Sequence, residues 1–192
     1  MGAPEIDGAR KTVEERGFRP RNCVWELTLA CNLRCLHCGS RAGGKRRGEL
    51  STEECLGVVR ELAELGCEHV TLSGGEPTAR ADWDIVAEAI ASRGIRVNMV
   101  THGVYRTERA RGLARRARDA GMCNVGVSVD GPEAIHDRIR GEGSFSRTMR
   151  SVGCFAAAAL PVTLLTTVSR INLHALSDVR ALAIEAGASQ WR

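Results

Sequence analysis

The sequence of 192 residues is poor in aromatic side chains and lacks any long apolar stretch. It holds only three Phe, three Trp and one Tyr, so a surface on which nucleic-acid bases stack against interleaved aromatic side chains is not expected. The longest apolar stretch, around residues 153–162, is too short to cross a bilayer and contains Pro161. The net charge of +4 is mild, and the arginines of residues 106–118 are interpreted as a solvated helix face. Nucleic acids and membranes are therefore not expected as partners.

A secretory signal is also missing from the amino terminus. Residues 1–21 are charged and contain no apolar stretch, so they are predicted to form a polar amino-terminal arm. Without a signal, a cytoplasmic location is predicted, and the eight cysteines are expected to stay reduced rather than form a disulfide framework. Five of them lie at or beside apolar positions and are expected to be small buried hydrophobes: Cys23, Cys55, Cys67, Cys123 and Cys154.

The remaining three cysteines form the most informative feature, Cys31-Asn-Leu-Arg-Cys35-Leu-His-Cys38. Thiolates are soft ligands that favour zinc, copper(I) or iron–sulfur clusters. A [4Fe–4S] cluster usually takes four cysteines, so a triplet without a near fourth indicates a cluster with one iron left open. The alternative is a zinc site with His37 as the fourth ligand, because zinc accepts three cysteines and one histidine.

Strand and helix patterns alternate from residue 22 to residue 192, which indicates an α/β fold with parallel strands. Strands are predicted at residues 22–29, 69–72, 95–100, 122–129, 161–168 and, as a beginning only, 189–192. Helices are predicted at residues 52–65, 82–93, 107–120, 132–160 with an interruption near 141–143, and 173–186. Ser51 and Glu54 form a capping box at the start of the first helix, and Asp82 is expected to cap the second.

Each chemistry-bearing segment follows the end of a predicted strand. Cys31–Cys38 follows the first strand, Gly74-Gly75-Glu76-Pro77 the second, Thr101-His102-Gly103 the third, and Ser128-Val-Asp-Gly131 the fourth. Because the carboxyl ends of parallel strands meet at one edge, these segments are expected to form a single site. The pattern fits two architectures, a doubly wound open sheet or a TIM-like barrel.

Taken in this order, the four segments resemble the motifs of the radical S-adenosylmethionine (radical SAM) superfamily. Residues 128–141 are similar to the subgroup that carries a carboxyl-terminal SPASM domain, which includes peptide and protein maturases. The resemblance implies a partial (β/α)6 TIM-like barrel, here with about five β/α units and the start of a sixth strand. Residues 22–192 would then be a radical SAM core domain, incomplete at its carboxyl terminus and without a SPASM domain.

The resemblance also implies two cofactors, a [4Fe–4S] cluster and S-adenosylmethionine. Cys31, Cys35 and Cys38 would hold three irons, and His37 is expected to pack over the cluster. The residues implied in binding S-adenosylmethionine are Gly74, Gly75, Glu76 and Pro77 for its amino group, Thr101 beside it, and Ser128 and Arg140 for its ribose or carboxylate. No catalytic residue beyond the cluster is assigned.

Three of these expectations carry alternatives. Arg140 is preferred over Arg138 as the partner of the cofactor carboxylate and is weighed against a structural ion pair with Asp137. Asp130 is expected to cap the turn at Gly131. His102 stands where the family usually has asparagine, which puts its polar contact near the cofactor in doubt.

The function implied is reductive cleavage of S-adenosylmethionine to a 5′-deoxyadenosyl radical, which abstracts hydrogen from a substrate. The expected substrate is a ribosomally made peptide or a protein side chain, and the expected electron donor is a reductase, a flavodoxin or a ferredoxin. Lys45-Arg46-Arg47, in the loop after the cysteines, is a candidate contact for an anionic substrate or partner. Two alternatives remain: a truncated fragment that binds the cluster without activity, and a zinc-stabilised binding module.

Overall fold

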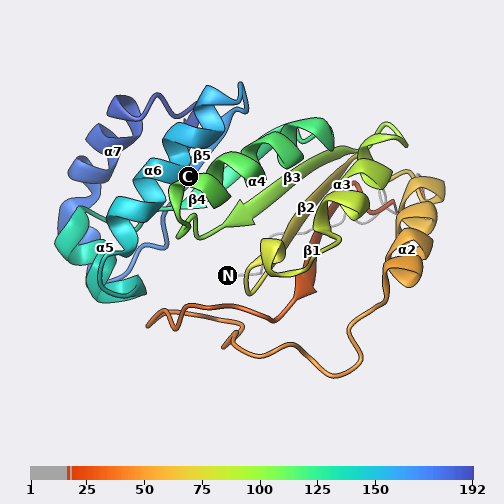
Figure 1. Cartoon of the computed structure of the whole chain (residues 1–192), viewed down its shortest axis with the longest axis horizontal. Coiled ribbons are helices and arrows are strands. Elements are labelled where there is room, and N and C mark those ends of the chain that lie inside the picture. The colour runs from red at the N-terminus through yellow and green to blue at the C-terminus, as the bar shows by residue number, and fades with distance from the viewer. Residues whose placement is uncertain (1–16, 18) are drawn as a thin grey trace, which may run out of the picture.

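A computed structural model describes residue 17 and residues 19–192, so the predicted arm at residues 1–21 lies almost wholly outside the described residues. The described chain forms one parallel sheet of β1 (Asn22–Thr28), β2 (His69–Gly74), β3 (Arg96–Thr101), β4 (Asn124–Ser128), β5 (Val162–Leu165) and β6 (Gln190–Trp191). The order of strands in the sheet is their order along the chain (Figure 1). A doubly wound sheet reverses its strand order at a switch point, and this sheet does not. The architecture is therefore an open, partial α/β barrel with β1 and β6 at its edges.

Helices follow the strands in regular alternation: α2 (Thr52–Glu64), η1 (Pro77–Ala79), α3 (Trp83–Ala91), α4 (Thr107–Asp119), α5 (Glu133–Arg140), α6 (Ser144–Ala157), η2 (Leu173–Ala175) and α7 (Leu176–Glu185). The predicted interruption near residues 141–143 is confirmed, because Gly141 and Gly143 separate α5 from α6 with φ values of 110° and 68°. The predicted sixth strand is also present. The fifth strand is shorter than predicted, since it ends at Leu165 rather than at residue 168.

The two predicted helix caps have different outcomes. At α2, the Glu54 N–H donates to the Ser51 hydroxyl over 3.2 Å and the Ser51 N–H donates to the Glu54 carboxylate over 2.7 Å, so the capping box is confirmed. Asp82 occupies the cap position of α3 but makes no capping bond. Its carboxylate instead accepts from Arg80 and from the Thr52 hydroxyl, which connects α3 to α2.

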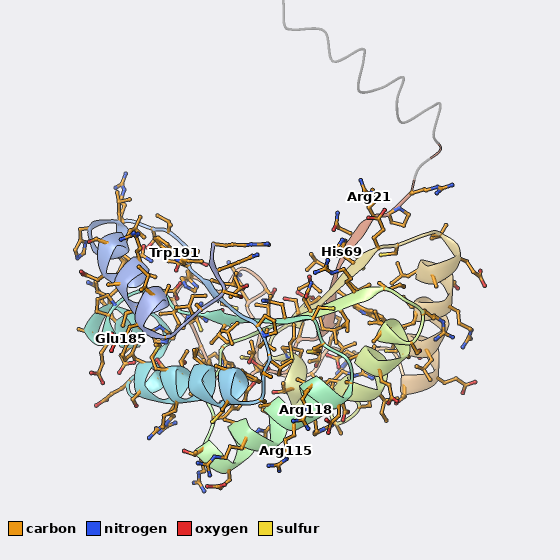
Figure 2. All side chains as sticks on the ribbon, turned by 90° about the horizontal axis from the view of Figure 1, so that it is seen from above. Arg21, His69, Arg115, Arg118, Glu185 and Trp191 are labelled. Atoms are coloured by element: carbon orange, nitrogen blue, oxygen red, sulfur yellow. The ribbon has the colours of Figure 1, made fainter. Side chains whose placement is uncertain are left out.

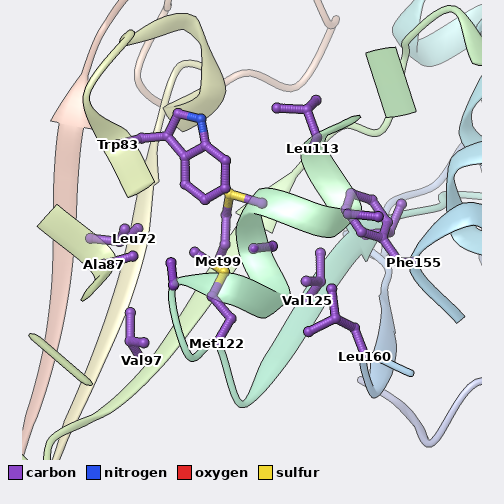
Figure 3. Packing of buried hydrophobic residues seen from close by; sticks show 14 of the residues in the cluster. Leu72, Trp83, Ala87, Val97, Met99, Leu113, Met122, Val125, Phe155 and Leu160 are labelled. Carbon is purple, nitrogen blue, oxygen red and sulfur yellow. The ribbon is translucent and has the colours of Figure 1, made fainter. Parts of the chain in front are cut away.

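The helices cover one face of the sheet, and the hydrophobic core lies between the helices and that face (Figure 2). Alternate residues of the strands point into this core, including Leu72, Met99 and Val125, which are fully buried. Trp83 of α3 lies over Met99 in the same layer (Figure 3). Other strand residues carry the remaining face, which holds partly exposed polar side chains such as Asn98. That second face is the concave side of the partial barrel.

Burial of the five non-motif cysteines was predicted for all of them and is confirmed for two, Cys55 and Cys67. The prediction is wrong for Cys23, Cys123 and Cys154, which are only partly buried. Cys23 lies on β1, which among the described residues has a neighbouring strand on one side only. Within the described residues, no helix combines the length and the apolar character needed to cross a bilayer.

Candidate functional site

The loop after β1 carries the cysteine triplet and is held at both of its ends. It crosses the edge of the sheet to reach α2, as the red-to-orange segment of Figure 1 shows. The Cys31 N–H donates to the Gly43 carbonyl over 3.0 Å, and the Gly43 N–H donates to the Leu29 carbonyl over 2.9 Å. The Glu49 carboxylate closes the base of the loop by accepting from the Thr28 hydroxyl and the Leu29 N–H, both at 2.9 Å. The cysteines are thus presented between two fixed ends.

All three cysteines are free, half-buried and line one cavity at the carboxyl ends of the strands. Backbone N–H groups already point at two of the sulfurs: Leu33 N lies 3.4 Å from the Cys31 sulfur and Ala42 N lies 3.4 Å from the Cys38 sulfur. Burial raises the pKa of the Cys31 and Cys35 thiols above their usual range. Such thiols lose their protons when a metal centre binds, because the metal ligand is the thiolate.

The arrangement does not suit a single zinc ion. Within the described residues, no three His, Cys, Asp or Glu side chains are placed to hold one metal ion. The Nε2 of His37, the fourth ligand in the zinc alternative, lies 2.9 Å from the Asp130 carboxylate, so this contact leaves Nδ1 as the ring nitrogen for a metal. An iron–sulfur cluster needs a wider arrangement of ligands, since each thiolate binds a different iron of the cluster. Three separate thiols around one cavity therefore fit a cluster better than a single ion.

Gly74 and Gly75 form the floor of the cavity and lie directly against the backbone that leads into the cysteine loop. The Gly75 N–H donates to the Thr28 carbonyl over 2.7 Å. A Cβ atom at Gly74 would lie 2.2 Å from the Thr28 oxygen, and one at Gly75 would lie 2.6 Å from the Ala30 oxygen. Gly74 also has a φ of 140°, which side chains rarely permit. Only glycine fits both positions, and these two glycines of the predicted motif line the cavity.

Glu76 and Pro77, predicted with these glycines, do not line the cavity. Glu76 is 2 % exposed, and its carboxylate accepts from the Thr101 hydroxyl over 2.8 Å and from the His102 N–H over 3.1 Å. Its other oxygen accepts from the Thr78 N–H and hydroxyl, at 3.1 and 3.0 Å. Thr101 does line the cavity, although its hydroxyl is taken by Glu76. The carboxylate therefore ties the ends of β2 and β3 together.

His102 joins this buried group to the cysteine loop. Its Nδ1 accepts from the Val104 N–H over 2.8 Å, so the proton of the neutral ring is on Nε2. Nε2 lies 3.0 Å from the Asn32 side-chain oxygen and 3.3 Å from the Glu76 carboxylate. Burial lowers the pKa of His102 and keeps the ring neutral. The residue that departs from the family pattern thus makes a defined polar contact between Asn32 and the end of β3.

A second buried carboxylate, Asp130, holds the opposite wall of the cavity. It is fully buried and accepts from Arg140 Nε over 2.6 Å and from the Thr167 N–H over 3.0 Å, besides its contact with His37. Arg140 lines the cavity, and its Nη1 lies 4.0 Å from the Cys35 sulfur. Burial alone would raise the pKa of Asp130, but the Arg140 charge and hydrogen bond bring that pKa below its usual value.

Two expectations are corrected by these contacts. Asp130 does not cap the turn at Gly131, and Arg140 pairs with Asp130 rather than with Asp137. Asp137 instead accepts from the Gly143 and Phe145 N–H groups, at 2.7 Å each, and so shapes the turn between α5 and α6. These partners come from separate elements, which spacing in the sequence does not reveal.

Replacing Asp130 by asparagine is expected to lower the free energy of unfolding by about 3 kcal/mol, because the Arg140 cation is left buried without a counter-charge. The pKa of Asp130 is depressed in the folded chain, so its contribution is present above its unfolded value of about 3.9 and is lost as the pH falls through the lower folded value. Urea unfolding at pH values from neutral to strongly acidic measures both effects.

Asp119→Asn is the matched control, since its pair with Arg118 is exposed and exposed pairs contribute about 0–1 kcal/mol. An Asp130→Asn protein as stable as the parent at neutral pH would contradict the inference that this ion pair holds the cavity wall.

The structure brings together eight of the ten predicted site residues: Cys31, Cys35, Cys38, Gly74, Gly75, Thr101, Ser128 and Arg140. Sequence reasoning missed Thr167, which also lines the cavity from the loop after β5. It also missed Asn172, fully buried, whose side-chain N–H₂ group donates to the Asp130 and Thr167 carbonyls over 2.9 and 3.0 Å. Neither lies in a recognisable motif.

Comparison with known proteins gives a family match over most of the described chain. The model of the family described as "Radical SAM superfamily" matches residues 25–183. The chain is 38% identical over 172 residues to the AdoMet-dependent heme synthase of Methanosarcina barkeri, covering 88% of this chain and 48% of that protein. It is 38% identical over 179 residues to the mycofactocin maturase MftC of Mycobacterium tuberculosis, covering 91% and 45%. The chain thus spans about half the length of the curated relatives it matches.

Among solved structures, the fold is similar to that of Streptococcus suis SuiB bound to S-adenosylmethionine. The TM-score is 0.77 at 17% identity, over 96% of this chain and 44% of SuiB. At that identity the likeness concerns the fold alone.

Proposed function

Because this chain belongs to the radical SAM superfamily, we propose that it is the catalytic core of an enzyme that cleaves S-adenosylmethionine reductively and abstracts hydrogen from a peptide or protein substrate. The family uses a [4Fe–4S] cluster and S-adenosylmethionine as cofactors. The observation that supports the proposal most directly is the single cavity lined by three free cysteines and by residues from the ends of β2, β3 and β4.

In this proposal Cys31, Cys35 and Cys38 hold three irons of the cluster as thiolates and leave the fourth iron open. When bound, the reduced cluster supplies the electron that splits S-adenosylmethionine into methionine and a 5′-deoxyadenosyl radical. The backbone of Gly74 and Gly75, which lines the cavity, would contact the amino group of S-adenosylmethionine, while the missing side chains let it pack against the start of the cysteine loop.

On the other wall, Ser128 and Arg140 would bind the ribose or the carboxylate of S-adenosylmethionine, and both line the cavity. Arg140 presents its guanidinium to the cavity while Asp130 fixes its Nε, and a guanidinium suits recognition of a carboxylate. We assign Glu76 a positioning role, because its carboxylate is occupied by donors from Thr101, His102 and Thr78.

A peptide or protein substrate is supported by relatives named mycofactocin maturase and PqqA peptide cyclase, the latter of Rhizobium meliloti and 40% identical over 170 residues. A second candidate is a heme precursor, because another relative at 38% identity is named AdoMet-dependent heme synthase. We also propose a cytoplasmic location, which the eight free cysteines support.

Anaerobic reconstitution of the chain with iron and sulfide is expected to give about four irons per protein and formation of 5′-deoxyadenosine under dithionite. Iron, sulfide and zinc content and the yield of 5′-deoxyadenosine are the measurements. Iron binding without 5′-deoxyadenosine would indicate a fragment that only binds the cluster, and zinc in place of iron would indicate the zinc-stabilised module. A yield that rises with an added porphyrin carboxylate, but not with peptides, would favour the second substrate.

A further inference from the structure

Two of the three cysteines are reached from two sides. Cys35 and Cys38 line the cofactor cavity on the inner side of the loop, and they also line a second hollow on its outer side. The outer hollow is walled by Arg34, Leu36 and Arg41 and contains none of the strand-end residues that line the inner cavity. These two cysteines therefore stand between the cofactor and the outside of the molecule.

The outer side of the loop is strongly basic. Residues 31–48 include five arginine or lysine residues besides the cysteines and no aspartate or glutamate, and all five cations are exposed. Arg46 pairs with Glu26, and Arg34 donates to the carbonyls of Leu33 and Ala42 at 3.0 and 3.3 Å. Within the described part of the chain, Arg41 and Arg47 have no ion-pair partner. The positive charges of Arg41 and Arg47 are thus left without an ion pair, whereas Arg46 is paired with Glu26 and Lys45 lies in the field of Glu49.

An apolar side chain, Leu36, lines the outer hollow together with Arg34 and Arg41. Leu36 is 67% exposed, yet its backbone is fixed because its N–H donates to the Ile139 carbonyl over 2.9 Å. A fixed apolar residue inside a polar rim is the usual composition of a protein–protein interface. Absence of an aromatic side chain in residues 31–48 argues against stacking of nucleic-acid bases here.

Arg41 adds a second reason to look for function at this surface. Its φ is 47°, in the left-handed region that glycine adopts readily and other residues rarely adopt. The sequence keeps an arginine where glycine would fit the backbone better, and such outliers concentrate at functional sites. The strained backbone places a cation on the rim of the outer hollow.

We propose that Arg34, Leu36, Arg41, Lys45 and Arg47, here called the outer basic surface, form the docking site for an acidic one-electron carrier protein. The inference rests on the proposed function, in which each cleavage of S-adenosylmethionine consumes one electron. The docked carrier gives up one electron and is oxidised by one unit, and the centre held by Cys35 and Cys38 is reduced by one. Bound S-adenosylmethionine would occupy the cavity on the inner side of those cysteines, so the carrier would approach from the outer side.

The direct test is the affinity of an acidic flavodoxin, oxidised so that no electron moves, for the reconstituted protein, measured by calorimetry. The Arg41→Gly/Lys45→Ser/Arg47→Ser variant is expected to bind it about ten-fold more weakly at about 50 mM salt and to show a shallower salt dependence. Glycine suits the φ of residue 41, and Arg34 is kept because its guanidinium holds loop carbonyls. Leu36→Ser is expected to weaken binding without changing the salt dependence.

The matched control removes three arginines from the far side of the molecule, as Arg115→Gln/Arg147→Gln/Arg150→Gln. These residues are exposed on α4 and α6, and Arg115 projects from α4 away from the sheet (Figure 2). Three results would each overturn the proposal. They are an equal loss of affinity in the control variant, no measurable binding of flavodoxin by the parent protein, and displacement of flavodoxin by a single-stranded oligonucleotide.

A second measurement separates this inference from the proposed function. With saturating dithionite, both triple variants are expected to form 5′-deoxyadenosine at the parental rate, because a small reductant needs no docking site. With reduced flavodoxin, only the Arg41→Gly/Lys45→Ser/Arg47→Ser variant is expected to form 5′-deoxyadenosine more slowly, by about ten-fold. If the parent protein formed no 5′-deoxyadenosine with dithionite, the proposed function would be contradicted, and the flavodoxin affinities alone would decide the docking site. If the Arg41→Gly/Lys45→Ser/Arg47→Ser variant lost activity with both reductants, the docking site would be overturned.

Discussion

Replacement of Cys31, Cys35 and Cys38 together by alanine is expected to abolish iron and sulfide binding and the brown colour of the reconstituted protein. The three thiols are free, line one cavity and are the only cysteines that line it within the described residues. Without them the cavity offers no soft ligands to iron. Formation of 5′-deoxyadenosine is expected to fall to background at the same time. Iron and sulfide analysis after anaerobic reconstitution checks the first effect.

The chain contains its own control for this experiment. Cys23, Cys123 and Cys154 are also free and partly buried, so a triple alanine variant at these positions removes the same number of thiols with similar exposure. This control is expected to keep the full iron content. If the Cys31/Cys35/Cys38 variant retained that content, or if both variants lost it equally, the ligand assignment would be wrong.

Gly74→Ala is expected to lower the free energy of unfolding by about 3 kcal/mol or more and to weaken binding of S-adenosylmethionine. The added Cβ would lie 2.2 Å from the Thr28 carbonyl oxygen, so the end of β1 has to move. The φ of 140° adds backbone strain that alanine cannot relieve. Because β1 leads directly into the cysteine loop, iron content is expected to fall as well. Urea unfolding of the iron-free protein, iron analysis after reconstitution and a binding titration with S-adenosylmethionine measure the three effects separately.

Gly153→Ala serves as the comparison, since Gly153 lies within α6 and a Cβ atom there meets nothing within 4 Å. This substitution is expected to stabilise the protein by about 0.5–1 kcal/mol, because alanine restricts the unfolded chain and favours helix. A Gly74→Ala protein with the stability and iron content of the parent would show that β1 tolerates displacement and that the close contact is not essential.

The elements of the fold were accessible to sequence reasoning because their signals are local. Gly66, Gly94 and Gly121 follow the helices α2, α3 and α4. The capping box of Ser51 and Glu54 involves residues only three apart. Two architectures nevertheless remained open, since strand order depends on pairing between residues 26 to 47 positions apart, such as Asn98 with Asn124 and Asn22 with His69. The sheet order settles that choice in favour of the partial barrel.

The polar interior of the site was much less accessible. Asp130 was expected to cap a local turn, yet its partners are His37, 93 residues before it, and Thr167, 37 residues after it. Glu76 was grouped with the cofactor-binding residues by its motif, yet it does not line the cavity, and its carboxylate accepts from Thr101 and His102 at the end of the next strand. A buried carboxylate takes whichever donors the fold brings near it, and a sequence pattern holds no information about those distant donors.

The strand order has a consequence for synthesis of the protein. Each strand pairs with the one made just before it, so the sheet grows by addition at one edge as the chain leaves the ribosome. The cysteines emerge with the first unit, whereas Arg140 and Thr167 emerge roughly 100 and 130 residues later. At a synthesis rate of about 5–20 residues per second, the interval between synthesis of the cysteines and synthesis of Arg140 and Thr167 is on the order of ten seconds. Iron inserted during that interval would meet a site that still lacks Arg140 and Thr167, so we expect the metal centre to assemble after translation.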